Sequence, residues 1–172
     1  MRTTRGFQTM DSEFEALRPW IEGVYALQEW HMSDGVSRPP QVEGRFVFLN
    51  GAVISVIHNR TQEANQTTVA AYGSYLLDAT QFSYRYEERS VFTQTPSKIT
   101  VSHVAPWEVM RSCSASREGD VVHLKAVNGQ QEFRFTAEGF TYSAENGKVL
   151  RVWRRVPFLI DRGKEQSLLR KI

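Results

Sequence analysis

The chain has 172 residues, of which 41% are hydrophobic and 23% are charged, and its formal net charge is +2. These values are typical of a globular protein of one domain with short appendages, and they exclude an intrinsically disordered chain. The only cysteine is Cys113, which excludes an intrachain disulfide framework and any Cys-rich zinc or iron–sulfur module.

The N-terminal residues 1–19 are expected to form an extension that contains one short helix. Ser12 is a favoured N-cap residue, and Glu15 three positions later completes a capping box. Leu17 and Ile21 then follow at helical spacing, which gives this helix an apolar side.

Residues 20–156 are expected to form an all-β domain, because signals for hairpin turns recur through them. Asn-Gly pairs stand at Asn50-Gly51, Asn128-Gly129 and Asn146-Gly147, each between two apolar or alternating segments. Type I′ hairpin turns need a positive φ at both central residues, and Asn and Gly tolerate that conformation best. Turn signals roughly ten residues apart are typical of an antiparallel sandwich or barrel.

The segments between these turns alternate with a period of two. Phe82, Tyr84 and Tyr86 share one face of a segment whose other face is polar. Such alternation places one face on a core and the other in water. A polar stretch at 61–70 is expected to form one or two helical turns. The expected strands lie near residues 23–32, 43–50, 52–59, 71–78, 81–90, 98–104, 108–117, 120–127, 130–137, 139–145 and 148–155.

A meander of this many strands has two unpaired edges unless it closes on itself. Because the connecting turns are short, we expect an up-and-down antiparallel barrel of eight to ten strands, with a two-sheet sandwich as the alternative. A barrel of this size has room for its own side chains or for one small ligand.

Residues 157–172 are expected to form a basic helical tail. Residues 151–172 hold seven of the 21 Lys and Arg residues and only two of the 19 Asp and Glu residues. The basic residues are separated by apolar ones, which does not favour a nucleic-acid partner. Leu168, Leu169 and Ile172 form an apolar stripe that would pack on the barrel wall or on a second subunit, so a homodimer is a possible assembly.

The motifs of the common enzyme classes are missing from the sequence. No Walker loop, Gly-x-Ser-x-Gly or Gly-x-Gly-x-x-Gly occurs, and the four histidines lack metal-ligand spacing. We therefore expect no cofactor and no metal, and we assign no catalytic residue. Cys113 lies two positions from Arg111 and so shares its strand face, but it is expected to be an ordinary strand residue.

No stretch approaches the roughly 18 apolar residues of a membrane span. No apolar run follows the basic residues near the N-terminus, so no secretory signal is expected and a cytoplasmic location is the default.

Aromatic residues on the expected strands suit a cavity that holds a mainly apolar ligand. Alternation from Tyr25 and Leu27 places Glu29 on their face, which leaves two alternatives: a buried carboxylate near Tyr84 with a raised pKa, or an exposed carboxylate at the barrel mouth. The candidate ligand-binding residues are Phe46, Phe48, Tyr75, Tyr84, Tyr86 and Trp107, with Glu29 and Arg111 as polar anchors near the mouth.

Five segments in order resemble the bacterial lipocalin-like domain family of the calycin superfamily. They are GVYAL at 23–27, GRFVF at 44–48, AYGSY at 71–75, REGD at 117–120 and LRVWRR at 150–155. The resemblance implies a closed β-barrel with an internal pocket. Lipocalins typically carry a Trp on the first strand, covered by an Arg from the last strand; here Tyr25 replaces that Trp, and Arg154 or Arg155 would stack on it.

The resemblance favours a barrel that binds a small, mainly apolar ligand. Two alternatives stay open: an isomerase- or cyclase-type enzyme that uses the barrel pocket, and a non-catalytic interaction protein that dimerises.

Overall fold

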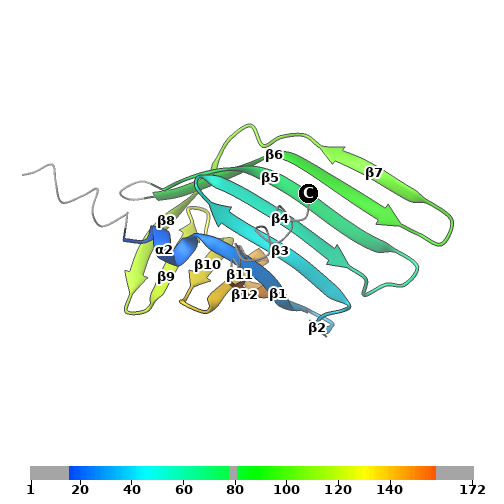
Figure 1. Ribbon diagram of the computed structural model, residues 1–172, viewed down its shortest axis with the longest axis horizontal. Coiled ribbons are helices and arrows are strands. Elements are labelled where there is room, and N and C mark those ends of the chain that lie inside the picture. The colour runs from blue at the N-terminus through cyan, green and yellow to red at the C-terminus, as the bar shows by residue number, and fades with distance from the viewer. Residues whose placement is uncertain (1–15, 78–80, 158–172) are drawn as a thin grey trace, which may run out of the picture.

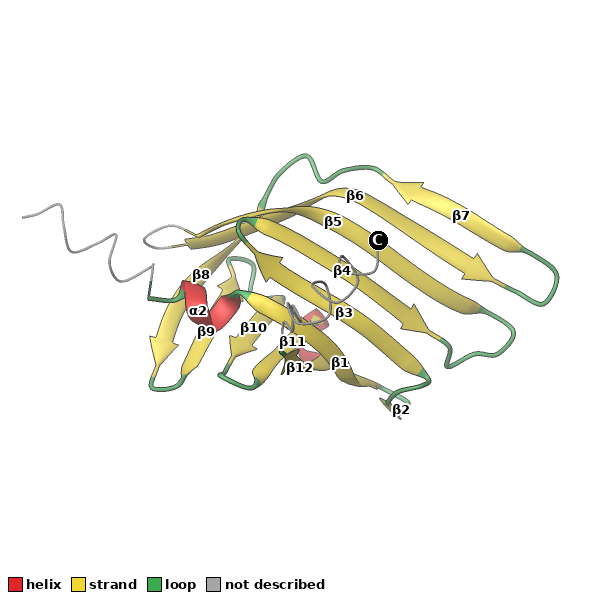
Figure 2. Cartoon of the chain, in the orientation of Figure 1, coloured by secondary structure: helices red, strands yellow, loops and turns green. Residues whose placement is uncertain are grey.

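The computed structural model describes residues 16–77 and 81–157, which form an all-β antiparallel barrel (Figure 1). The expected capping box and the stripe at 168–172 lie outside these residues. Helix in the described part is limited to α2 (Arg18–Ile21) and the 3-10 turn η1 (Glu145–Gly147), which are red in Figure 2. No helix within 16–77 or 81–157 is long and apolar enough to cross a membrane.

Twelve strands build the sheet, and ten of them close it into a barrel by pairing of the last strand with the first. Their order around the barrel is β1, β3, β4, β5, β6, β8, β9, β10, β11 and β12. The antiparallel barrel is thus confirmed over the sandwich. The strands are β1 (Gly23–Met32), β2 (Gly35–Ser37), β3 (Val42–Leu49), β4 (Ala52–Asn59), β5 (Gln66–Leu77), β6 (Gln81–Gln94), β7 (Ile99–Val104), β8 (Arg111–Glu118), β9 (Val121–Ala126), β10 (Gln131–Phe135), β11 (Gly139–Ala144) and β12 (Val149–Val156).

One side of the barrel is extended. The long strands β5 and β6 continue past the shorter β8 to β11, and β7 pairs with the outer half of β6 (Figure 1). The expectation of helical turns at 61–70 is wrong for 66–70, which belong to β5. Residues 67–70 pair with β4 on one side and with β6 on the other, so sheet hydrogen bonding on both edges fixes them as strand.

The three Asn-Gly pairs all lie in hairpin connections. Asn50 and Gly51 have φ values of 49° and 81° and form a two-residue loop of the expected type between β3 and β4. The Asn128 hairpin has a longer loop, with positive φ at Gly129. The Asn146 hairpin passes through η1 and adds a positive φ at Glu145.

Aromatic rings fill one end of the barrel. Phe48 is 0% exposed, and its ring lies 5.7 to 6.4 Å from those of Tyr75, Phe82, Phe133, Phe135 and Phe140. Most of these pairs meet edge to face, which aromatic quadrupoles favour. This end is therefore a packed core without room for a ligand.

A β-bulge in β1 changes which of its residues face inward. Tyr25 and Leu27 are buried, but the register with β12 shifts between Leu27 and Glu29, so Gln28 is an extra residue. One extra residue reverses the alternation beyond it. Trp30 consequently faces the interior, and Glu29 does not.

A second bulge, in β6, also changes which residues face inward. Gly73 of β5 pairs with Tyr86, and the next pair skips Glu87, so Arg89 joins Tyr86 on the inner face. The two backbones approach closely here, because a Cβ added to Gly73 would lie 1.9 Å from the carbonyl oxygen of Arg85. Only glycine fits opposite this bulge.

Candidate functional site

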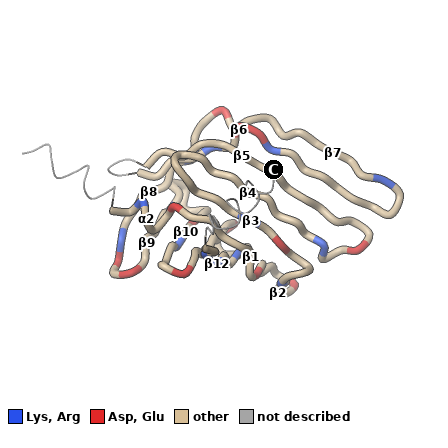
Figure 3. The backbone as a smooth tube through the Cα atoms, in the orientation of Figure 1, with Lys and Arg blue, Asp and Glu red and all other residues tan. Residues whose placement is uncertain are grey.

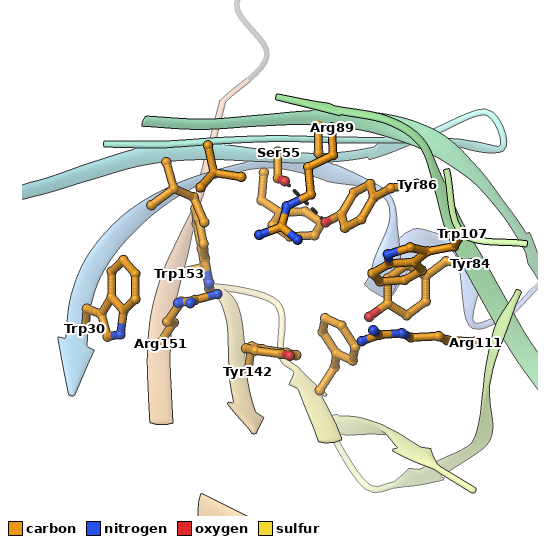
Figure 4. A pocket seen from close by; sticks show the side chains of 15 residues that line it. Trp30, Ser55, Tyr84, Tyr86, Arg89, Trp107, Arg111, Tyr142, Arg151 and Trp153 are labelled. Atoms are coloured by element: carbon orange, nitrogen blue, oxygen red, sulfur yellow. Dashed lines mark hydrogen bonds between the residues drawn. The ribbon is translucent and has the colours of Figure 1, made fainter. Parts of the chain in front are cut away.

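The end of the barrel opposite the packed core contains a cavity of about 240 Å³ (Figure 4). Ten of the lining residues are labelled in the figure; nine of them lie on strands of the barrel, and Trp107 lies in the segment between β7 and β8. The lining consists of Trp30, Phe46, Ser55, Ile57, Val69, Ala71, Tyr84, Tyr86, Arg89, Trp107, Arg111, Phe133, Tyr142, Arg151 and Trp153.

Aromatic rings form most of the cavity wall. Trp107, in the segment that follows β7, packs 5.0 Å from the ring of Tyr86 and 5.6 Å from that of Tyr84. On the opposite side, Phe46 and Trp153 lie edge to face at 5.5 Å. Such walls suit flat apolar or aromatic groups.

Three arginines also point into the cavity: Arg89 from β6, Arg111 from β8 and Arg151 from β12 (Figure 4). None of their side chains forms an ion pair or a hydrogen bond with any residue in the described ranges. In the described chain as a whole, acidic and basic positions are interspersed (Figure 3). The cavity differs, since its lining includes no Asp or Glu within 16–77 and 81–157.

The Arg151 side chain is largely enclosed by protein. Its guanidinium carbon stands 4.1 Å from the ring centroid of Trp30 and 5.6 Å from that of Tyr142. Its Nε atom is buried and has no hydrogen-bond partner within 16–77 and 81–157, and the same holds for the indole Nε1 of Trp30. Burial lowers the pKa of Arg151, and the neighbouring charge of Arg89 lowers it further.

Arg111 lies nearer to solvent and is an exposed residue. Its guanidinium carbon sits 3.7 Å from the centroid of the Trp107 ring, a cation–π contact. Arg111 therefore marks the open side of the cavity, whereas Arg151 marks its interior.

Hydroxyl groups supply the remaining polar atoms. The hydroxyls of Ser55 and Tyr86 are hydrogen-bonded at 3.2 Å, the dashed line in Figure 4. Burial raises the pKa of Tyr84, Tyr86 and Tyr142, so all three phenols stay protonated at neutral pH and can donate hydrogen bonds.

Five of the eight candidate residues from the sequence line this cavity: Phe46, Tyr84, Tyr86, Trp107 and Arg111. Phe48 and Tyr75 lie instead in the packed end of the barrel, where both are at most 2% exposed. The Tyr75 hydroxyl donates a hydrogen bond to the carboxylate of Glu22, which ties this end of the barrel to α2.

Glu29, the eighth candidate, lies outside the cavity lining. Its carboxylate accepts hydrogen bonds from Arg38 at 2.7 and 2.9 Å and contacts His31 at 2.6 Å. The hydrogen bonds from Arg38 and then His31 lower its pKa, opposite to the direction expected of a buried acid. The structure therefore does not support the buried alternative: the Glu29 side chain is 28% exposed, and the bulge at Gln28 turns it away from the interior.

Sequence reasoning did not single out Trp30, Arg89, Tyr142 or Arg151. Arg151 shares its strand face with Trp153, and Tyr142 shares its face with Phe140. The alternation of these strands could therefore have predicted that Arg151 and Tyr142 face inward. Trp30 and Arg89 follow bulges, so alternation from the earlier residues of their strands gave them the wrong face.

Cys113 and Arg111 share the inner face of β8, as expected, but the thiol does not line the cavity. Cys113 is 1% exposed, and burial raises its pKa to about 11. The thiol is therefore protonated at neutral pH and lacks nucleophilic character. Within the described ranges no group of three or more His, Cys, Asp or Glu residues is placed to hold a metal ion.

Comparison with models of known protein families, with curated proteins and with solved structures found no match to this chain.

Proposed function

We propose that this protein is a binding module that holds one small, mainly apolar ligand inside its barrel. The observation that carries the proposal is the aromatic-walled cavity of about 240 Å³ at one end of a barrel whose other end is filled. Pockets for drug-sized ligands measure roughly 300–1,000 Å³, so this cavity fits a smaller molecule.

We also propose that the barrel is lipocalin-like. The guanidinium of Arg155, from the last strand, lies over the ring of Tyr25 on the first strand, which supports the pattern that the resemblance implied. The barrel departs from lipocalins in strand number, since ten strands close it and lipocalins have about eight.

Binding in such a cavity would be driven mainly by removal of apolar surface from water, at about 25 cal/mol per Å². The loss of translational and rotational freedom offsets several kcal/mol of this gain. For a ligand of this size we expect dissociation constants in the micromolar range.

The enzyme alternative receives less support from the same lining. Proton transfer at neutral pH needs a group whose pKa lies near 7. The described lining has no His, Asp, Glu or Cys, and its tyrosines have raised pKa values. A binding role requires no such group.

The test uses the chain's own fluorescence. Three of the four tryptophans, Trp30, Trp107 and Trp153, line the cavity, so a bound molecule will change their emission. We expect a neutral apolar dye to shift this emission in the wild type. Ala71→Leu places a larger side chain in the cavity and is expected to weaken uptake by about tenfold or more.

The matched control is Ala70→Leu, the same change one position earlier in β5, at a residue that does not line the cavity. It should leave dye uptake unchanged. A folded wild type that takes up no apolar probe, or two variants that bind equally well, would contradict the proposal.

A specific observation favours dimerisation as a second candidate function. β7 pairs only with β6 among the described strands, and it exposes Ile99 by 66% and Val101 by 48%. An exposed edge strand is a template for pairing with the same strand of a second copy. Light scattering should then report a dimer for the wild type and a monomer for Val101→Lys; a monomeric wild type would exclude it.

A further inference from the structure

The three cavity arginines face one another without a counter-charge. Arg89, Arg111 and Arg151 come from different strands, and none has an acidic partner in the described chain. Arg89 and Arg151 are close enough for their charges to repel each other. Arg111 is exposed, but Arg151 is largely buried. Buried charges in native proteins are normally paired, because an unpaired charge in a low-dielectric setting is costly.

The cation–π contacts of Arg111 and Arg151 do not neutralise the positive charge of the cavity. Trp30 and Tyr142 face the guanidinium of Arg151, but its buried Nε–H has no hydrogen-bond acceptor in the described part of the chain. The buried indole N–H of Trp30 likewise has no acceptor among the described residues. Buried N–H donors without acceptors, next to two positive charges, are well suited to bind a negatively charged oxygen.

We infer, building on the proposed binding function, that the ligand is a small organic carboxylate whose anionic group is held between Arg89 and Arg151. Arg151 is the inner anchor, and its planar guanidinium can donate two parallel hydrogen bonds to one carboxylate. The Trp30 ring supports the Arg151 guanidinium from one side. The protonated hydroxyls of Tyr86 and Tyr142 lie at the same cavity and can donate as well.

The remaining lining indicates the body of this molecule. The rings of Tyr84, Phe133 and Trp107 also line the cavity, and Trp107 stacks on Arg111 at its open side. A body that fills this space is aromatic or short and aliphatic, since the whole cavity measures about 240 Å³. A long-chain fatty acid would not fit within that volume.

The experiment compares hydrocinnamate with hydrocinnamyl alcohol, which share the same phenylpropyl body and differ in the charged group. Isothermal titration calorimetry gives the affinity of each for the wild type, Arg151→Leu, Arg89→Leu and Arg154→Leu. Arg154 is an exposed residue of β12 outside this cavity, so it controls for the loss of one positive charge. Circular dichroism checks that each variant is folded.

We expect the wild type to bind the carboxylate at least about tenfold more tightly than the alcohol, the scale of one charge-assisted hydrogen bond. Arg151→Leu and Arg89→Leu should each reduce the carboxylate affinity to that of the alcohol and change the alcohol affinity less than about twofold. Arg154→Leu should change neither.

Two results would overturn the inference and leave the binding function standing: equal affinities for acid and alcohol in the wild type, or a carboxylate preference that survives both arginine substitutions. If neither compound binds and the neutral dye is also excluded, the proposed function itself fails.

Discussion

Arg155 lies over the ring of Tyr25, with its guanidinium carbon 5.1 Å from the ring centroid, and donates a hydrogen bond of 2.9 Å to the Tyr25 hydroxyl. The same guanidinium donates to the backbone carbonyl oxygens of Glu22 at 2.6 Å and of Trp20 at 2.7 Å. Arg155 therefore joins the last strand, the first strand and the end of α2, at the seam where β12 and β1 close the barrel.

Replacement of Arg155 by leucine should destabilise the protein. The change leaves the carbonyls of Trp20 and Glu22 without this donor, and hydrogen bonds to charged groups contribute about 1.5–3 kcal/mol each. We expect a loss of about 2–3 kcal/mol in the free energy of unfolding, measured by urea denaturation. Arg154→Leu, at the exposed neighbour, should stay within about 0.5 kcal/mol. Equal effects of the two changes would contradict the role of Arg155 at the seam.

Gly73→Ala should be among the most damaging alanine substitutions in the chain. Its Cβ would lie 1.9 Å from the Arg85 carbonyl oxygen, so β5 and β6 would have to separate at the bulge. Gly129→Ala is a matched change at a turn with a φ of +70° and no atom within 4 Å of the added Cβ, and it should cost about 1–2 kcal/mol. We expect a distinctly larger loss of unfolding free energy for Gly73→Ala than for Gly129→Ala. A larger loss for Gly129→Ala would contradict the close approach of β5 and β6 at Gly73.

The Cys113 thiol makes stability fall at alkaline pH. Burial raises its pKa from 9.0 to about 11, so the folded protein keeps a proton that the unfolded chain releases. The resulting stability is fully present below pH 9 and is lost as the pH rises towards 11. Cys113→Ala should reduce the slope of unfolding free energy against pH in this range by at most about 1.4 kcal/mol per pH unit. Because the buried tyrosines titrate in both proteins, the comparison isolates the thiol, and identical slopes would exclude its contribution.

Arg151→Leu should not destabilise the ligand-free protein. The substitution removes a partly buried charge that has no ion pair in the described chain and leaves an apolar side chain against Trp30 and Tyr142. Replacement of buried charged groups by packed apolar ones is often neutral or stabilising by about 1–4 kcal/mol. Thermal unfolding without ligand should give an equal or higher midpoint than the wild type. A loss above about 1 kcal/mol would show that the charge already has a structural partner.

The all-β class and most strands of this protein were predictable from local sequence. Alternation and turn residues act over two to ten neighbouring residues, so segments such as 23–32 and 52–59 and the tight turn at Asn50-Gly51 need no distant information. The alternation on β6 likewise placed Tyr84 and Tyr86 on one inner face.

Tertiary structure alone decided which residues meet in the cavity. Gln28 and Glu87 carry no local mark of a bulge, since each extra residue exists only relative to the register of a partner strand. Those two insertions turn Trp30 and Arg89 inward and keep Glu29 outside. Alternation likewise could not say which end of the barrel Phe48 would occupy. Barrel closure, which joins strands far apart in the sequence, placed the phenylalanines at one end and left three arginines facing the space at the other.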